Sequence, residues 1–218
     1  MGRGEGANEG AEIAPGRKQS PKLSPQLLKV LAPATARAWT ALVPLLPREL
    51  YLGGGTAVAV HLSHRESQDL DFFFHKKAVN LKALASKLKG TGQFWIDQDS
   101  PGTLTGLFGE TKVEFFHLDE DEEGIQILLE KPQLVEGLHI AGLKDLLAMK
   151  LMAIGGRGEM RDYFDVKLIE EQGGLLVEDG LVYWIDRYQA GPGGARCIFR
   201  CGPESTRLGA ASIGDRSR

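Results

Sequence analysis

Residues 52–74 read LGGGTAVAVHLSHRESQDLDFFF, and this stretch decides the expected fold. Three glycines follow a short apolar strand, and the apolar run at 57–62 predicts a helix directly after them. Asp69 and Asp71 then lie two positions apart in a second apolar strand. Because a strand alternates its faces, both carboxylates point to one side while their apolar neighbours point to the other.

The acids and the glycines together predict a site for a metal ion and a phosphate. Two close anions repel unless a cation lies between them, and Mg²⁺ prefers carboxylate oxygens and keeps positions open for phosphate. Gly54 and Gly55 let the backbone approach a ligand, and Thr56 is expected to cap the helix and leave its first N–H groups facing an anion. Each signal alone has a simpler interpretation: an exposed strand edge for the acids, a tight turn for the glycines.

Two common glycine motifs are excluded. A P-loop requires Gly-Lys followed by Ser or Thr, which the sequence lacks. A dinucleotide fingerprint beginning at Gly53 and Gly55 would need a third glycine where the chain has Val58. The stretch therefore supports neither a Walker ATPase nor a Rossmann site.

The order Gly-Gly-Thr-Ala at 54–57 and His-Arg-x-Ser-x-Asp-Leu-Asp-Phe-Phe at 64–73 resembles the nucleotide-binding element of the polymerase β nucleotidyltransferase superfamily. It is most similar to the AbiEii/AbiGii-type nucleotidyltransferase toxins of bacteria, over roughly residues 40–170. The resemblance implies an α/β (α+β) fold: a small mixed twisted sheet flanked by helices, with a helical C-terminal part.

The resemblance also implies an activity, the transfer of a nucleoside monophosphate from an NTP to an acceptor hydroxyl. Two Mg²⁺ ions, with Mn²⁺ as a substitute, would assist, and the acceptor would be RNA, most simply the 3′ end of tRNA. The enzyme would be the toxin of a toxin–antitoxin or phage-defence system, with a cognate antitoxin as partner. The implied metal ligands are Asp69, Asp71 and Glu114, and the implied nucleotide-binding residues are Gly54, Gly55, Thr56, Arg65, Ser67 and Lys150.

Glu114 is singled out by its place in the expected strand 111–117. Alternation puts Lys112, Glu114 and Phe116 on one face, so an acid lies within an apolar strand, where acids are rarely buried without a partner. In the family resembled, a third carboxylate on a neighbouring strand completes the metal site, often as Asp. An edge-strand Glu paired with a nearby lysine is the alternative interpretation.

A second signal lies in the expected helix 143–154, where Lys150 falls in the middle of an apolar stripe. A lysine in such a position usually extends its amino group to solvent. The order of Lys150, Arg157 and the run Arg161-Asp162-Tyr163-Phe164-Asp165 nevertheless resembles the family's downstream block, in which a lysine reaches the triphosphate. Asp162 and Asp165 share one helical face, and we expect them to hold Lys150, Arg157 or Arg161 in place.

Composition limits the classes of protein to which the chain can belong. The chain has 218 residues, 42% hydrophobic and 25% charged, and a net charge of −3, which argues against a broad DNA-coating surface but leaves room for a local basic patch. Its two cysteines make a zinc site or a disulfide framework improbable, and its apolar runs are too short for a membrane span. We expect a cytoplasmic protein without membrane contact.

The expected organisation has four parts. Residues 1–20 are a disordered tail, 21–118 the nucleotidyltransferase core, 119–189 a helical part that completes the nucleotide site, and 190–218 a flexible basic tail. Two short helices follow a cap at Ser24, and Gly155, Gly156 and Gly158 form a turn between helices. Further strands are expected at 49–52, 93–97, 103–108 and 125–129, and a last helix at 175–188.

Four lysines near the second strand suggest how a polyanionic acceptor docks: Lys76, Lys77, Lys82 and Lys89. The simpler interpretation is a solvated helix face. Two other functions also stay open, a non-catalytic member that binds a nucleotide or a protein partner, and a nucleotidyltransferase acting on a small hydroxylated compound such as an aminoglycoside.

Overall fold

The computed structural model describes residues 23–75, 79–118 and 128–188, whose strands form one mixed sheet. The strand order across the sheet is β3-β4-β5-β2-β1-β7-β6. β2 is parallel to β5 and β1 is parallel to β7, whereas the other neighbouring pairs are antiparallel. The predicted small mixed sheet is therefore confirmed. Its strands are β1 Tyr51–Leu52, β2 Leu70–His75, β3 Phe94–Ser100, β4 Thr103–Phe108, β5 Thr111–Leu118, β6 Gln133–Val135 and β7 Leu138–Ile140.

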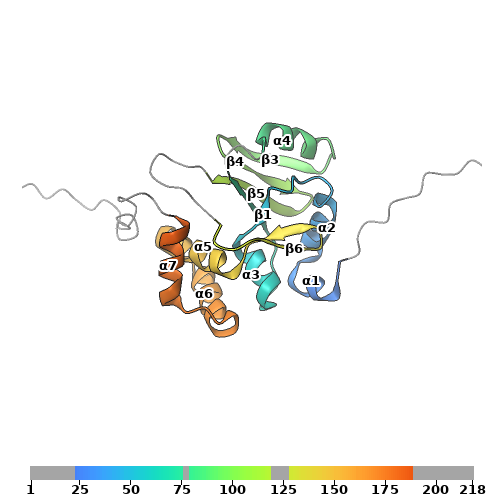
Figure 1. The fold of residues 1–218 in the computed structure, drawn as a ribbon. Coiled ribbons are helices and arrows are strands. Elements are labelled where there is room, and N and C mark those ends of the chain that lie inside the picture. The colour runs from blue at the N-terminus through green and yellow to red at the C-terminus, as the bar shows by residue number, and fades with distance from the viewer. Residues whose placement is uncertain (1–22, 76–78, 119–127, 189–218) are drawn as a thin grey trace, which may run out of the picture.

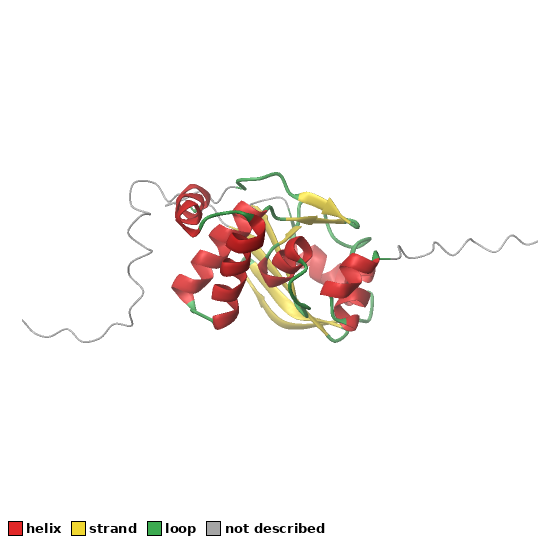
Figure 2. Cartoon of the chain, turned by 90° about the horizontal axis from the view of Figure 1, so that it is seen from below, coloured by secondary structure: helices red, strands yellow, loops and turns green. Residues whose placement is uncertain are grey.

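Helices flank the sheet, and the last three gather beside one another (Figures 1 and 2). None of the helices in the described ranges is long and apolar enough to cross a membrane. Their bounds are α1 Pro25–Val30, α2 Pro33–Leu42, α3 Gly54–Leu62, α4 Leu81–Lys89, α5 Leu143–Gly156, α6 Met160–Gly173 and α7 Val177–Arg187.

Strand alternation gives the sheet two unlike faces. The buried face includes the side chains of Phe72 and Phe115, which stack with ring centroids 5.4 Å apart, and it forms the hydrophobic core. The opposite face carries the acids and is called here the acid face. Its cross-strand pairs on β2 and β5 are Asp71 with Glu114 and Phe73 with Phe116.

Helices α2 and α4 pack on the buried face. Trp39 of α2 and Leu88 of α4 are fully buried in the core with Phe115, and α4 contacts β3 and β4 (Figure 1). Lys82 and Lys89 are exposed on α4. These two lysines therefore lie on the side of the sheet opposite the acid face. Lys76 and Lys77 lie outside the described residues.

Most expected elements appear with small changes in their ends. Ser24 caps α1 by accepting the N–H of Leu27, as predicted. The predicted cap at Thr56 is wrong, because α3 begins at Gly54 and Thr56 lies inside it. Gly155 and Gly156 belong to α5 and leave the turn to Gly158, which has φ 61°.

The segment between β5 and α5 differs more from expectation. β7 pairs parallel to β1 and is a strand that the sequence did not lead us to expect. The part of the expected strand 125–129 that is described, residues 128 and 129, is not a strand. Both predicted tails lie outside the described residues. The 119–189 part thus contributes β6 and β7 to the sheet as well as three helices.

A buried arginine fastens α7 to the rest of the molecule. Arg187 is fully buried and donates to the Asp145 carboxylate of α5 and, at 2.7 Å, to the Tyr51 hydroxyl of β1. Asp145 also accepts the backbone N–H groups of Leu129 and Glu130, each at 3.0 Å. One charge pair therefore joins α7, α5, β1 and the segment before β6.

We expect Arg187→Met to destabilise the fold by about 3 kcal/mol, because it leaves the Asp145 carboxylate buried without its charge partner. The measurement is chemical unfolding at pH 7. Lys167→Ala is the control: it breaks an exposed pair with Glu171 and should change the unfolding free energy by about 0.5 kcal/mol or less. Equal effects of the two substitutions would contradict this role for Arg187.

Candidate active site

The site begins where β1 ends and α3 starts. Gly54 has φ 62°, and a Cβ built on it would lie 2.0 Å from Oδ2 of Asp71. A Cβ on Gly55 would lie 2.2 Å from a guanidinium nitrogen of Arg65. Glycine is therefore required at both positions, because a side chain at 54 would collide with Asp71 and a side chain at 55 with Arg65. The N–H groups of the first turn of α3, which have no carbonyl partner within the helix, lie at the same place.

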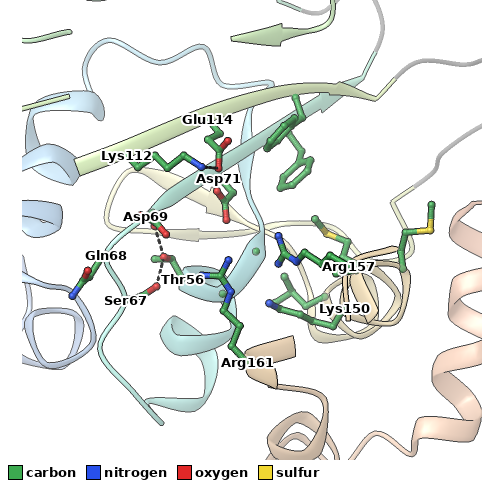
Figure 3. Close-up of a pocket in the computed structure, with 18 of the residues that line it drawn as sticks. Thr56, Ser67, Gln68, Asp69, Asp71, Lys112, Glu114, Lys150, Arg157 and Arg161 are labelled. Atoms are coloured by element: carbon green, nitrogen blue, oxygen red, sulfur yellow. Dashed lines mark hydrogen bonds and ion pairs between the residues drawn. The ribbon is translucent and has the colours of Figure 1, made fainter. Parts of the chain in front are cut away.

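Side-chain hydrogen bonds fix the loop between α3 and β2. The Thr56 hydroxyl contacts the Ser67 hydroxyl at 2.7 Å and donates to the Asp69 carbonyl. Thr56 and Ser67 are buried, although both line the pocket. In this structure their hydroxyl groups hold the start of the Asp69–Asp71 strand against α3, and Figure 3 shows these bonds.

Three acids meet on the acid face: Asp69, Asp71 and Glu114 all line one pocket. Asp71 and Glu114 are direct neighbours across β2 and β5 (Figure 3). Burial, together with the charges of Glu114 and Asp69, raises the pKa of Asp71 to about 6. The acids therefore repel one another through a poorly solvated space, which is the condition that a bound cation relieves.

Lys112 is the nearest cation to these acids on the sheet. Its Nζ donates to Oε2 of Glu114 at 2.9 Å. This contact is the lysine pairing that the sequence left open as an alternative for Glu114. It does not remove Glu114 from the pocket, whose lining includes both residues.

The acids suit a divalent metal by chemistry rather than by a closed ligand shell. Among the described residues, no three His, Cys, Asp or Glu side chains are arranged to hold an ion. The donors are nevertheless carboxylates, which Mg²⁺ prefers, and burial together with the charges of Glu114 and Asp69 raises the pKa of Asp71. Asp69, Asp71 and Glu114 therefore fit a site that binds its metal together with a ligand that completes the coordination.

A cationic group from α5 and α6 lies across the pocket from the acids (Figure 3). Lys150 is only 4% exposed, and its Nζ lies 2.8 Å from both Asp162 and Asp165. Arg157 donates to Asp162 through Nε at 2.8 Å and Nη2 at 3.1 Å. Lys150 therefore does not extend to solvent: buried carboxylates hold it at the pocket.

Asp165 is the centre of this group. Its carboxylate accepts from Arg65 at 3.2 and 3.3 Å, contacts Nε2 of His64 at 3.0 Å and pairs with Lys150. Burial alone would raise the pKa of the Asp165 carboxyl, but the bonds from His64 and Arg65 and the Lys150 charge hold that pKa well below its usual value. Asp165 thus stays ionised and anchors two cations that come from different elements.

Of the three cations expected to be held by Asp162 and Asp165, Lys150 and Arg157 are held and Arg161 is not. Arg161 pairs with Glu159 at 2.6 Å and lines the pocket as an exposed side chain. Asp165 also holds Arg65, which was not expected. Arg65 comes from a loop far away in sequence, which no helical spacing could indicate.

The pocket has a volume of about 610 Å³ and three kinds of wall. The acids form one wall and the cations another. An apolar wall comes from Phe73, Phe116, Met149 and Tyr188, none of which the sequence analysis assigned to the site. Arg157 was named there only as a cation to be held. Its separation of seven residues from Lys150, about two helical turns, was the signal that places Arg157, at the end of α5, on the same side as Lys150.

The fold and this site define the class of protein. It is an α/β domain with one pocket in which three acids face a set of cations, and buried carboxylates hold these cations in place. The chain belongs to the family described as Nucleotidyl transferase AbiEii toxin, Type IV TA system, whose model matches residues 37–207. The resemblance inferred from the sequence is thereby confirmed.

Individual relatives match a smaller part of the chain. An uncharacterized protein of Aquifex aeolicus (strain VF5) is 35% identical over 122 residues, which are 54% of this chain and 56% of that protein. The chain therefore spans about half the length of this curated relative. Among solved structures, JHP933 from Helicobacter pylori has a TM-score of 0.46 and 21% identity, covering 77% of this chain and 80% of that one. The antibiotic-resistance factor ANT(2″)-Ia has a TM-score of 0.48 and 14% identity, covering 67% and 91%.

Gly54→Ala tests the close approach of backbone and acid. We expect about 1–2 kcal/mol of destabilisation from the left-handed backbone, and in addition a loss of Mg²⁺-dependent nucleotide binding because the new methyl group displaces Asp71. Gly92→Ala is the matched control, with φ 70° and nothing within 4 Å of the added Cβ. Thermal unfolding and nucleotide titration are measured for both. Equal nucleotide affinity in the two variants would show that Gly54 serves the turn alone.

Asp165→Asn should destabilise the protein by about 3 kcal/mol at pH 7, since it removes the charge that pairs with buried Lys150 and partly buried Arg65. The pKa of Asp165 is depressed in the folded state, so its stabilisation is complete above the unfolded value of about 3.9 and is lost as pH falls further. The difference between wild type and variant should therefore shrink from pH 7 to pH 3 in urea unfolding. Glu171→Gln, at an exposed position, is the control. A difference that is constant with pH would refute the ionised anchor.

Proposed function

We propose that this protein is a metal-dependent nucleotidyltransferase that transfers a nucleoside monophosphate from an NTP to an acceptor hydroxyl, releasing pyrophosphate. The observation that carries the proposal is the opposition of three acids to Lys150, Arg157 and Arg65 across one pocket. A metal–triphosphate ligand fits such a pocket, because the acids favour the metal and the cations favour the phosphates.

In this proposal Asp69, Asp71 and Glu114 hold Mg²⁺, most simply two ions, with Mn²⁺ as a substitute. When bound, the metal activates the attacking hydroxyl and neutralises the developing charge on the leaving pyrophosphate. In such a displacement the protein contributes mainly by positioning the reacting groups and by stabilising the charge of the transition state. The rigid β2–β5 pairing supplies the position of Asp71 and Glu114.

The phosphates are assigned to the opposite wall. Gly54 and Gly55 offer backbone N–H groups at the start of α3, and Arg65 lies directly over Gly55. Lys150 has three N–H donors, and its contacts with Asp162 and Asp165 use two of them. We assign the third to a phosphate oxygen. The 119–189 part completes the nucleotide site in this way, and Thr56 and Ser67 support it from within the loop.

We assign RNA as the acceptor, with the 3′ end of tRNA as the first candidate, and a toxin role opposed by a cognate antitoxin. The support is the family, whose description names a toxin of a type IV toxin–antitoxin system. The reaction would take place in the cytoplasm, where NTPs and RNA are both available. Incubation of the purified protein with each labelled NTP and total RNA is the direct test, and a labelled RNA species is the expected result.

A non-catalytic nucleotide-binding role is favoured by one observation, the 2.9 Å pair between Lys112 and Glu114. A protein of that kind would bind an NTP with Mg²⁺ on Asp69 and Asp71 alone. Glu114→Gln separates the two functions. It should abolish transfer by the enzyme we propose, whereas a non-catalytic protein would bind NTP unchanged and show no transfer before or after the substitution.

Asp69→Asn and Asp71→Asn should each lower transfer by a hundredfold or more, because each removes a metal-binding charge and keeps the side-chain shape. Asp71→Asn should leave the unfolding temperature unchanged or raise it, since the Asp71 carboxylate is disfavoured by burial and by two neighbouring acids. Asp99→Asn, on β3 opposite Leu104, is the matched strand acid outside the pocket and should be fully active. A loss below tenfold in both site variants, with normal melting, would exclude the metal site.

A further inference from the structure

The acid face continues beyond the pocket onto β4 and β3. The pocket lining on the sheet ends at β5, with Lys112, Glu114 and Phe116. Register places Thr105 of β4 opposite Glu114, and Gln98 of β3 opposite Thr105. An acceptor whose hydroxyl reaches Glu114 from outside the pocket therefore has this extension of the acid face in front of it.

The next row of the extension contains the large side chains. Leu107 pairs with Lys112 on one side and with Trp95 on the other, so the three residues form a line across β5, β4 and β3. Trp95 is 58% exposed and Leu107 is 39% exposed. We call this line the Trp95 row. It lies next to the row of Gln98, Thr105 and Glu114, two residues away on β4 and β5 and three on β3, where the register shifts between Ile96 and Gln98.

An exposed tryptophan on a sheet face is a feature that single-stranded nucleic-acid-binding proteins use. A nucleobase of any identity stacks on an aromatic ring, and a lysine beside the ring binds the phosphate that follows. In the Trp95 row Leu107 separates the indole from Lys112, whose Nζ lies 2.9 Å from Glu114. Lys112 has three N–H donors, and the contact with Glu114 uses one.

Distances along the sheet fit a short strand. Trp95 is two strands away from Glu114 and two residues along, which corresponds to roughly 12 Å at ordinary strand spacing and rise. This is within the reach of the last two or three nucleotides of an extended chain whose terminal hydroxyl lies at Glu114. A small hydroxylated acceptor without a nucleobase would have no ring to stack on Trp95.

We propose that the Trp95 row binds the 3′-terminal nucleotides of an RNA acceptor strand, with one nucleobase stacked on Trp95 and a backbone phosphate on Lys112. The proposal rests on the proposed nucleotidyl transfer, since it places the acceptor of that reaction. It also moves the acceptor surface away from Lys82 and Lys89, which lie on the other side of the sheet.

Tryptophan fluorescence gives a readout that does not need activity. The chain has three tryptophans, and Trp39 and Trp184 are 0% and 6% exposed, so Trp95 is the accessible one. A single-stranded oligoribonucleotide with a free 3′ hydroxyl should quench the fluorescence of the full chain and protect it from acrylamide. Trp95→Phe should abolish the quenching, and the apparent affinity should fall as salt is raised.

Labelling of RNA gives the second readout. Trp95→Ala should raise the RNA concentration needed for half-maximal labelling by roughly tenfold, whereas Trp95→Phe should retain most of the wild-type value. Leu134→Ala is the control, since Leu134 is 67% exposed on β6 at the far edge of the sheet. NTP titration should be unchanged in all three variants, because none of these residues lines the pocket.

The outcomes separate the two proposals. Quenching that is absent, or that persists in Trp95→Phe, overturns the Trp95 row, as does RNA labelling that Trp95→Ala leaves unchanged. Transfer to a small hydroxylated compound or to a protein, with no RNA bound, overturns it as well. Quenching that depends on Trp95 without transfer to any acceptor sustains the RNA surface and contradicts the proposed enzyme instead.

Discussion

The Asp165 carboxylate holds the described fold and its pocket together. It accepts from Arg65 on the loop after α3 and pairs with Lys150 of α5, while its own backbone belongs to α6. Three elements therefore meet at one buried charge. A buried ion pair adds little net stability against an apolar core of equal volume, but breaking one by removing a partner is severe. Removing Asp165 is therefore expected to cost more than its ion pairs add to the net stability.

The pocket maintains two opposite charge states in close proximity. On the sheet, acids are crowded until burial and mutual repulsion raise the pKa of Asp71. On the helices, each cation is bound to a carboxylate of the protein, so Lys150 and Arg157 keep fixed positions without any ligand. A site built in this way has fixed positions for its cations and crowded charge on its acids, which favours a ligand that brings positive and negative groups together.

Strand and helix periodicity was enough to predict which site residues of one strand or helix share a face. The alternation of acids on β2, the position of Glu114 beside them and the shared face of Asp162 and Asp165 follow from strand and helix periods. Partners far away in sequence were beyond such reasoning. Thr56 bonds to Asp69 and Ser67 rather than capping its helix, and Arg65 reaches Asp165 one hundred positions later. The side of the sheet that α4 covers was likewise set by tertiary packing.

The order of the site residues along the chain has a consequence during synthesis. The acids lie between positions 69 and 114, whereas the cation wall needs Asp162 and Asp165, and α7 is fastened through Arg187 to Tyr51 across 136 positions. Synthesis proceeds from the N-terminus, and distant contacts form only after loop closure. A growing chain therefore contains all three acids before Asp162 and Asp165, which hold the cations, have been made. A fragment that ends before these two residues has the acids without a complete cation wall.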